Sequence, residues 1–277
     1  MAEMKLFLGC TIPNRLPHLE KAIRIVFDKL GVQTSDAAFH CCPEPIGLQT
    51  VNQKTWVTMA ASNLAIAEAE GKDIVSACNG CTQTLKGANT ELKHDAALKA
   101  EVNTVLSKVG QTFNGSVNVK HFVDVLVDEV GIDKIKAAVT KPLSGLKVAC
   151  HAGCHYGRPG KIMNTEHPFI PVNLRKLVVA IGATPVDYEM EPVCCGTGAG
   201  NTFKEVGDNI ATTKLNDAKT AGANIAAVNC PACFQQLDGQ RVIPVAYITQ
   251  LMALAMGSTY DDLSMKLHRT KAKDLLA

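Results

Sequence analysis

Eleven cysteines, arranged in a pattern that occurs twice, constrain this 277-residue chain more than any other feature. Each half holds a single cysteine, then an adjacent pair, then a Cys-x-x-Cys. An internal repeat of this kind predicts two copies of one structural unit. The cysteines of the pattern are Cys10, Cys41, Cys42, Cys78 and Cys81 in the first half, and Cys154, Cys194, Cys195, Cys230 and Cys233 in the second.

The flanking sequence repeats as well, and it predicts two similar domains, residues 1–142 and residues 143–277, the second with a C-terminal tail. Beyond each Cys-x-x-Cys, the segment Val119–Gly131 resembles Pro244–Gly257. The first half carries additional helix-patterned sequence, about Thr82–Val109. Because the same landmarks recur in the same order, we expect the domains to be related by pseudo-twofold symmetry.

Short apolar runs that end near cysteines are typical of buried strands, and amphipathic helix patterns lie between them. This alternation predicts an α/β fold in which each domain is a small, mostly parallel sheet flanked by helices. Ligands of such sheets bind at the carboxyl ends of the strands, where we expect the cysteines. The expected strands are Lys5–Gly9, Ala37–His40, Ile74–Ala77, Lys147–Ala149, Val186–Met190 and Ile225–Asn229. The expected helices include Leu19–Leu30, Trp56–Glu70, Val172–Ile181 and Phe203–Ala221, with Gly31, Gly71, Gly182 and Gly222 at their C-terminal ends.

The composition removes several classes of function. The formal net charge of +2 gives no electrostatic bias toward nucleic acid. The longest apolar stretches, such as Leu174–Ala183, fall short of the roughly 20 residues that span a bilayer. The N-terminus lacks a signal-peptide pattern. We therefore expect a cytoplasmic protein without a direct membrane span, and in that compartment structural disulfides are rare.

Five thiolates in each half exceed the four ligands of a structural zinc and the four of a cubane cluster. Soft thiolates in this number favour iron–sulfur chemistry, with zinc as the alternative. Cys150 stands outside the pattern, because Gly153-Cys154 aligns with Gly9-Cys10. We expect Cys150 to be a buried residue of the preceding strand.

On these motifs the chain resembles a known family, the tandem cysteine-rich CCG domains found in the B subunit of heterodisulfide reductase from methanogens and their relatives. The resemblance extends from Leu6 to about Gly257. It implies two noncubane 4Fe–4S clusters, one held by the five cysteines of each half. It also implies reduction of the heterodisulfide of coenzyme M and coenzyme B to two free thiols. The motifs that carry it are Cys10, Cys41-Cys42-Pro43, Cys78-Asn79-Gly80-Cys81, Cys154-His155-Tyr156-Gly157-Arg158-Pro159, Cys194-Cys195-Gly196 and Cys230-Pro231-Ala232-Cys233.

The family also implies partners. The sequence shows no dinucleotide fingerprint after a strand and no P-loop, so electrons must come from another protein of a complex. The resemblance implies the ferredoxin-like C subunit of heterodisulfide reductase and its flavin-bearing A subunit, with a hydrogenase or a formate dehydrogenase further upstream.

Two alternatives stay open. One is a CCG-type electron-transfer or quinone-reducing subunit of a glycolate oxidase- or fumarate reductase-like complex. Such subunits typically carry a fused ferredoxin segment, which this sequence lacks. The other is a zinc-binding interaction module.

Basic residues near the single cysteines are candidates for binding the anionic groups of the two coenzymes. Arg15 follows Cys10 and Arg158 follows Cys154, and a guanidinium recognises planar anions, although solvated surface charges are the alternative. His155 is a candidate proton donor to the departing thiolates, or else a structural hydrogen-bonding residue. We expect three further histidines to be packing or surface residues: His40, His121 and His151.

The two halves depart from each other after the cysteine pair, where Pro43 stands in place of Gly196. Proline has no backbone N–H to donate to a cluster sulfur. Hydrogen bonds to sulfur tune the potential of a cluster. We therefore expect both sites to form but to differ in potential.

Overall fold

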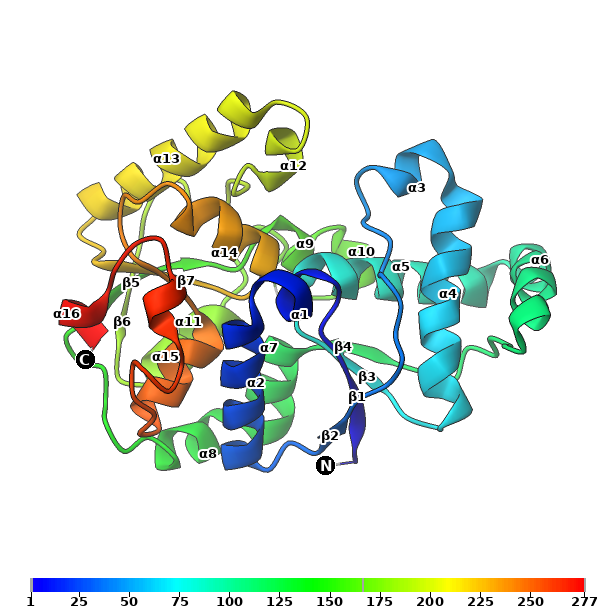
Figure 1. Ribbon diagram of the computed structural model, residues 1–277, viewed down its shortest axis with the longest axis horizontal. Helices are drawn as coiled ribbons and strands as arrows, with labels where there is room; N and C mark the ends of the chain where they lie inside the picture. The colour runs from blue at the N-terminus through cyan, green and yellow to red at the C-terminus, as the bar shows by residue number, and fades with distance from the viewer. Residues whose placement is uncertain (1, 166, 277) are drawn as a thin grey trace.

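The computed structural model describes residues 2–165 and 167–276. Two four-stranded sheets lie side by side, surrounded by helices, and all strand pairs in them are parallel (Figure 1). The strand order is β2-β1-β3-β4 in the first sheet and β6-β5-β7-β8 in the second. The shared order confirms both the α/β fold and the internal repeat.

Strands and helices alternate in both halves, with additional short helices in each, and η marks short 3-10 or π helices. Those of the first half are β1 (Met4–Phe7), α1 (Thr11–Arg15), α2 (Pro17–Leu30), β2 (Thr34–Ser35), α3 (Leu48–Val51), α4 (Gln53–Ala69), β3 (Ile74–Ser76), α5 (Asn79–His94), α6 (Ala96–Leu106), η1 (Ser107–Val109), β4 (Val119–His121), α7 (Phe122–Asp124), η2 (Val125–Val130) and α8 (Ile132–Ala137). Those of the second half are β5 (Lys147–His151), α9 (Cys154–Gly157), α10 (Gly160–Met163), α11 (Asn173–Ala180), β6 (Thr184–Val186), α12 (Thr197–Gly200), α13 (Lys204–Thr220), β7 (Ile225–Val228), α14 (Pro231–Asp238), β8 (Val245–Tyr247), α15 (Ile248–Ala255), η3 (Met265–Leu267) and α16 (Lys273–Leu276).

Four of the predicted strands and all four predicted helices occur close to their expected places. Each of the four glycines after the helices has a positive φ, between 65° for Gly71 and 94° for Gly222, as a helix C-terminus favours. The additional segment of the first half, Thr82–Val109, is helical as expected, in α5, α6 and η1. The short strands β4 and β8 were not predicted as strands, although the repeat matches the segments that contain them.

Two predicted strands are wrong. Ala37–His40 is irregular, because β2 ends at Ser35 and the backbone N–H of His40 donates to the side chain of Asn63 rather than to a strand. Val186–Met190 contains only the last residue of β6, and the N–H of Met190 donates to the Asp217 carboxylate at 2.8 Å. In both halves, a side chain of the long helix after the cysteine pair, α4 or α13, forms a hydrogen bond with the segment that leads to that pair.

The halves pack reciprocally. The helix that precedes the second strand of each half contacts the helices after the fourth strand of the other half: α2 contacts α15, and α11 contacts α7 and η2. This exchange is what a pseudo-twofold relation requires. Leu6 and Val75 join a core that includes residues of both halves, whereas Phe7 and Ile74 face a separate core with α4 and α5. Alternate strand residues thus face opposite sides, as a pleated strand dictates.

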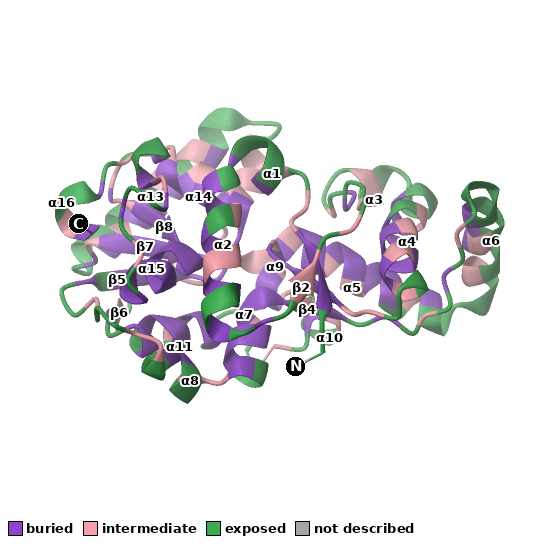
Figure 2. Ribbon diagram, turned by 60° about the horizontal axis from the view of Figure 1, so that its bottom comes forward, coloured by how far each residue is buried: buried purple, intermediate pink, exposed green. Residues whose placement is uncertain are grey.

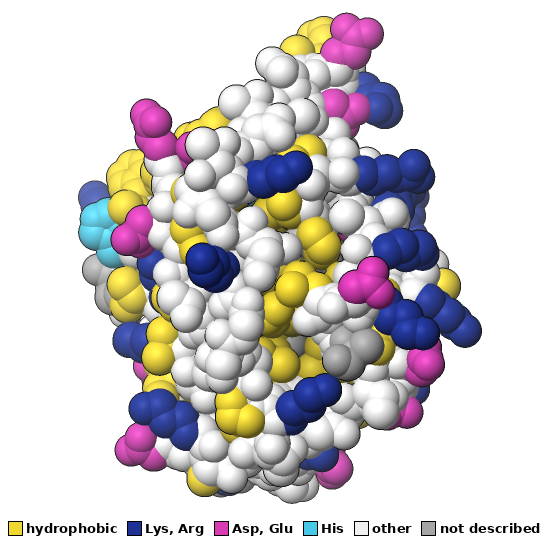
Figure 3. Space-filling view, turned by 90° about the vertical axis from the view of Figure 1, so that its left-hand side faces the viewer, with side chains coloured by type: hydrophobic (Ala, Val, Ile, Leu, Met, Phe, Trp, Pro, Cys, Tyr) yellow, Lys and Arg dark blue, Asp and Glu magenta, His cyan; other side chains and the backbone are white. Residues whose placement is uncertain are grey.

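Burial follows this arrangement. In Figure 2 the strands are mostly buried, whereas α6 is largely exposed at the end of the first half. The second half carries a groove of about 310 Å³ whose apolar lining includes Leu143, Leu254 and Tyr260. On that side of the molecule, hydrophobic side chains gather in a hollow edged by Lys and Arg (Figure 3). No helix in the described part of the chain has the length and apolarity needed to cross a membrane. The domain boundary near residue 142 stays a prediction.

Candidate metal centre

Each Cys-x-x-Cys opens a helix at the carboxyl end of the third strand of its sheet. Cys78 caps α5 and Cys230 caps α14, both with extended backbone, and the second cysteine of each motif lies in the first helical turn. Helix N-termini carry free N–H groups and a positive dipole end, which favour thiolates. The sheet order therefore brings sequence-distant cysteines to one place, as the parallel topology predicts.

A continuous run of thiol contacts joins ten of the eleven cysteines. Three Sγ–Sγ distances along it are 3.0 Å for Cys42–Cys81, 4.0 Å for Cys78–Cys230 and 3.9 Å for Cys154–Cys194. The second half of the run mirrors the first, and the halves meet where Cys78 contacts Cys230. In order, the run is Cys10, Cys41, Cys42, Cys81, Cys78, Cys230, Cys233, Cys195, Cys194 and Cys154.

The run reaches the surface at one end and approaches it at the other. Cys10 and Cys41 are exposed, Cys154 and Cys194 are half-buried, and the thiols between them are buried or half-buried. A small molecule would therefore meet the outer sulfurs first.

Hydrogen bonds within the run lower the pKa of three thiols, those of Cys42, Cys78 and Cys194. Those from Cys41 and Cys81 lower the pKa of Cys42, and those from Cys154 and Cys195 lower the pKa of Cys194. By contrast, burial raises the pKa of Cys150 to about 12. Cys150 lies on β5 and is 1% exposed, as predicted, and it remains a neutral thiol.

Two glycines let the chain pass close to the sulfurs. Gly9 and Gly153 have φ values of 70° and 83°. A Cβ on Gly9 would lie 2.7 Å from the Sγ of Cys81, and a Cβ on Gly153 would lie 3.3 Å from that of Cys233. Only glycine tolerates both the backbone conformation and this approach.

The loops before the two cysteine pairs are held by different side chains. In the first half, the buried amide of Asn63 donates to the carbonyl of Cys41 at 3.2 Å. In the second half, Lys214 on α13 is 1% exposed and burial lowers its pKa to about 8. Its ammonium donates to three backbone carbonyls, those of Met190, Glu191 and Val193. Lys214 was not among the predicted site residues, because nothing in a helix pattern marks a lysine as buried.

Backbone donors also differ between the two pairs. The N–H of Gly196 donates to the Sγ of Cys194 at 3.4 Å. Gly196 has a φ of 91°, and a Cβ there would lie 2.4 Å from the carbonyl oxygen of Gly207. Pro43 has no such N–H, so the expected difference between the halves is present in the backbone.

His151 lies among the sulfurs, contrary to the prediction that it serves only for packing. One of its ring nitrogens and the Sγ atoms of Cys195 and Cys233 lie within 4.8 Å of one another. The ring is 2% exposed, and burial lowers its pKa well below the usual value. Neither ring nitrogen makes a hydrogen bond of normal geometry with a described residue, although the backbone of Glu191 lies near. Its position at the end of a strand, three residues before Cys154, was the available signal.

The other predicted site residues differ in burial and in their contacts. Arg158 donates to the carbonyl of Pro192 at 3.4 Å, stacks 5.0 Å from the Phe169 ring, and lines a small pocket together with His151. The half-buried His155 lies beside Gly80 of the first half. Arg15 is exposed at the end of α1. His40 is exposed, and the buried His121 accepts a hydrogen bond from the N–H of Val123.

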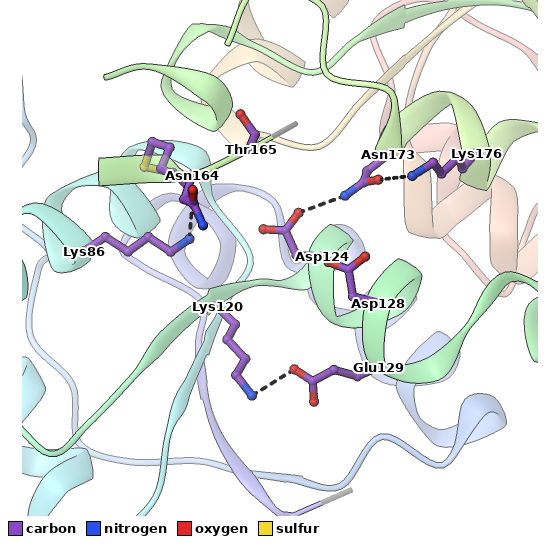
Figure 4. A pocket seen from close by; sticks show the side chains of 10 residues that line it. Lys86, Lys120, Asp124, Asp128, Glu129, Asn164, Thr165, Asn173 and Lys176 are labelled. Atoms are coloured by element: carbon purple, nitrogen blue, oxygen red, sulfur yellow. Dashed lines mark hydrogen bonds and ion pairs between the residues drawn. The ribbon is translucent and has the colours of Figure 1, made fainter. Parts of the chain in front are cut away.

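A pocket of about 370 Å³ lies between the halves, and none of the ten cysteines lines it. Figure 4 shows Asn173 between Asp124 and Lys176, with distances of 3.4 Å and 2.9 Å. Asp124 also accepts a hydrogen bond from the hydroxyl of Tyr156, two residues after Cys154. These pairings fasten α9 to the first half and so help to position Cys154.

The donor set fits iron–sulfur clusters. A zinc ion needs four ligands, and the group of His151, Cys195 and Cys233 offers three. However, both cysteines of that group belong to the longer run, in which each half supplies five soft thiolates. Soft donors in this number suit iron and sulfide better than one closed zinc site.

Comparison with known proteins identifies the family. The model of the cysteine-rich domain CCG matches residues 4–86 and 148–238. The whole chain is 36% identical to the B subunit of the Ferredoxin/F(420)H(2)-dependent CoB-CoM heterodisulfide reductase of Methanosarcina acetivorans, of which it covers 97%. It is 29% identical to the 8-methylmenaquinol:fumarate reductase membrane anchor subunit of Wolinella succinogenes, over 95% of each chain.

Among solved structures, a hypothetical protein from Helicobacter pylori shares the fold, with a TM-score of 0.75 and 14% identity. The match covers 97% of this chain and 52% of that one. The two matches of the CCG model cover the first three strands of each sheet, apart from Lys147 of β5, and take in all ten cysteines of the run. The chain therefore belongs to the tandem cysteine-rich CCG domain family, in the branch of the heterodisulfide reductase B subunits.

Proposed function

We propose that this chain is the iron–sulfur subunit that reduces the heterodisulfide of coenzyme M and coenzyme B to two free thiols. In this proposal each half holds one noncubane 4Fe–4S cluster with its five cysteines. The observation that carries it is the run of ten thiols, symmetric about the Cys78–Cys230 contact and open to solvent at Cys10 and Cys41. The names of the relatives in Methanosarcina support the choice of substrate.

The reaction consumes two electrons and two protons, breaks one S–S bond and releases two thiols. When bound, the clusters would supply the electrons. The chain contributes their proximity, because Cys78 and Cys230 are 4.0 Å apart and the two sites can serve one substrate. His155 is the candidate proton donor, and its position between the halves supports this role. Arg158 and Arg15 are the candidates for binding the acidic groups of the coenzymes.

We propose that electrons arrive from a ferredoxin-like C subunit and a flavin-bearing A subunit, with a hydrogenase or formate dehydrogenase further upstream. The names of the relatives describe subunits of larger reductases, which supports a complex. We place that complex in the cytoplasm, as the sequence predicts.

The alternative is a CCG-type electron-transfer or quinone-reducing subunit, and the relative in Wolinella favours it. Oxidation of the assembled complex in the presence of the coenzyme M thiol separates the two functions. A new paramagnetic cluster signal is expected for a disulfide reductase. Its absence, with full iron and acid-labile sulfide, would favour quinone reduction. Zinc without sulfide would contradict both functions.

Replacing Arg158 by alanine is expected to raise KM for the heterodisulfide about tenfold or more with little change in kcat. A hydrogen bond to a charged group contributes roughly 1.5–3 kcal/mol, and loss of uniform binding appears in KM. Steady-state kinetics of the complex measures this change. Arg24→Ala is the control, since Arg24 pairs with Glu20 and Asp36 on α2 and its neighbouring loop. An unchanged KM in Arg158→Ala would remove Arg158 from the substrate site.

A further inference from the structure

The first strands of the two halves end in different side chains at equivalent positions. His151 ends β5 and Phe7 ends β1, each three residues before the single cysteine of its half. The register confirms the equivalence. His151 pairs with Val228 and Phe7 pairs with Ser76, and each partner lies two residues before a Cys-x-x-Cys. A hydrogen-bonding ring thus occupies the position in the second half that a hydrocarbon ring occupies in the first.

One helix in each half holds the backbone near the cysteine pair with a side chain, and these two side chains differ in charge. Lys214 on α13 and Asn63 on α4 both bond to backbone just before or at the pair of their half. All three hydrogen bonds of Lys214 go to carbonyls, so its nitrogen acts as a full ammonium donor. Its charge interacts with three thiols, those of Cys233, Cys195 and Cys194.

Other nearby groups add to the same difference. In the second half, the Gly196 N–H donates to Cys194, and the Arg158 charge interacts with Cys154. In the first half, Pro43 has no N–H, and the carboxylate of Glu44 interacts with Cys42. The sulfurs of the second half therefore have more hydrogen-bond donors and more positive charge around them.

His151 needs a partner. Leaving a polar group buried without a hydrogen bond costs free energy, and among the described residues its ring nitrogens have none of normal geometry. The sulfurs of Cys195 and Cys233 lie next to the ring. An imidazole keeps at least one N–H in every protonation state that proteins use, and thiolate or sulfide sulfur accepts such a bond.

We propose that His151 donates an N–H hydrogen bond to a sulfur of the second cluster, and that His151 and Lys214 give this cluster the higher reduction potential of the two. This inference rests on the clusters of the proposed function. Reduction adds negative charge to a cluster, so nearby donors and cations stabilise the reduced form. Electrons that enter the chain therefore settle first on the cluster of the second half.

The test is a redox titration of the assembled complex, followed by electron paramagnetic resonance, in His151→Phe and in the reciprocal Phe7→His. His151→Phe gives the second half the residue of the first. We expect the midpoint potential of the higher-potential cluster to fall while the other stays unchanged. We expect the midpoint potential to fall by about 59 mV. For a one-electron couple, this shift changes the ratio of oxidised to reduced cluster at a fixed potential about tenfold.

Two further variants separate the hydrogen bond from packing and from charge. His151→Gln keeps an N–H donor. The midpoint potential of its second cluster should therefore differ less from the unmodified value than the potential in His151→Phe does. Lys214→Gln removes the charge and keeps a donor, and it should lower the potential of the same cluster. Phe7→His introduces a donor beside the first cluster and should raise the lower of the two potentials.

The outcomes are distinguishable. Unchanged potentials in His151→Phe, with full iron content, would overturn the inference. Loss of iron from both His151→Phe and His151→Gln would indicate a structural role for the imidazole ring and would also overturn the inference. If the unmodified chain binds no iron and sulfide, the proposed function fails instead.

Discussion

Replacing Cys194 by serine is expected to abolish disulfide reduction and to remove about half of the iron and labile sulfide of the chain. Cys194 contacts Cys154 at 3.9 Å, and neighbouring thiols and the Gly196 N–H lower its pKa, so it is a preferred thiolate ligand of its half. A serine oxygen is a harder donor and binds iron–sulfur clusters less well. Cys41→Ser should have the same effect on the first half, because Cys41 is one of its five proposed ligands and contacts both Cys10 and Cys42. Iron and sulfide analysis, together with turnover of the complex, measures both effects.

Cys150→Ser provides the matched control. Cys150 is buried on β5, and among the described cysteines it is the one outside the run of contacts. Its loss should leave the iron content and the turnover close to those of the unmodified complex. Full iron and full turnover in Cys194→Ser or Cys41→Ser would contradict the two-cluster mechanism, whatever the control shows.

Replacing Gly9 by alanine is expected to lower the occupancy of the first cluster at least tenfold, with a similar loss of turnover. Loss of a group that orients a metal ligand typically lowers metal affinity or activity by about tenfold or more. The new Cβ would lie 2.7 Å from the Sγ of Cys81, a ligand in the proposed cluster, and that sulfur must move. The φ of 70° adds strain of roughly 1–2 kcal/mol for any residue other than glycine. Iron analysis and thermal unfolding of the complex separate the two effects.

Gly71→Ala is the control for backbone strain. Gly71 has a φ of 65°, and nothing lies within 4 Å of a Cβ built there. This variant should lose a comparable amount of stability and keep its iron. Equal iron content in Gly9→Ala and Gly71→Ala would show that the close approach to Cys81 does not matter for the cluster.

Much of the fold was readable from the sequence, because local patterns carry it. Buried strands such as Ile74–Ser76 appear as apolar runs, and glycines such as Gly31 and Gly222 mark helix ends. The predictions failed at Ala37–His40 and Val186–Met190, where single long-range hydrogen bonds to Asn63 and Asp217 set the path of the chain. Periodicity in sequence contains no information on such bonds.

The repeat, the parallel α/β class and the division of ten thiols into two sets of five can all be read from the amino-acid sequence. These properties follow from residue types and spacings along the chain. The folded chain is needed to see that the two sets meet at Cys78 and Cys230, and that His151 and Lys214 lie beside the second set. Those contacts depend on strand register and on the reciprocal packing of the halves. Both arise between segments far apart in sequence, where burial and charge are set by neighbours that no local pattern specifies.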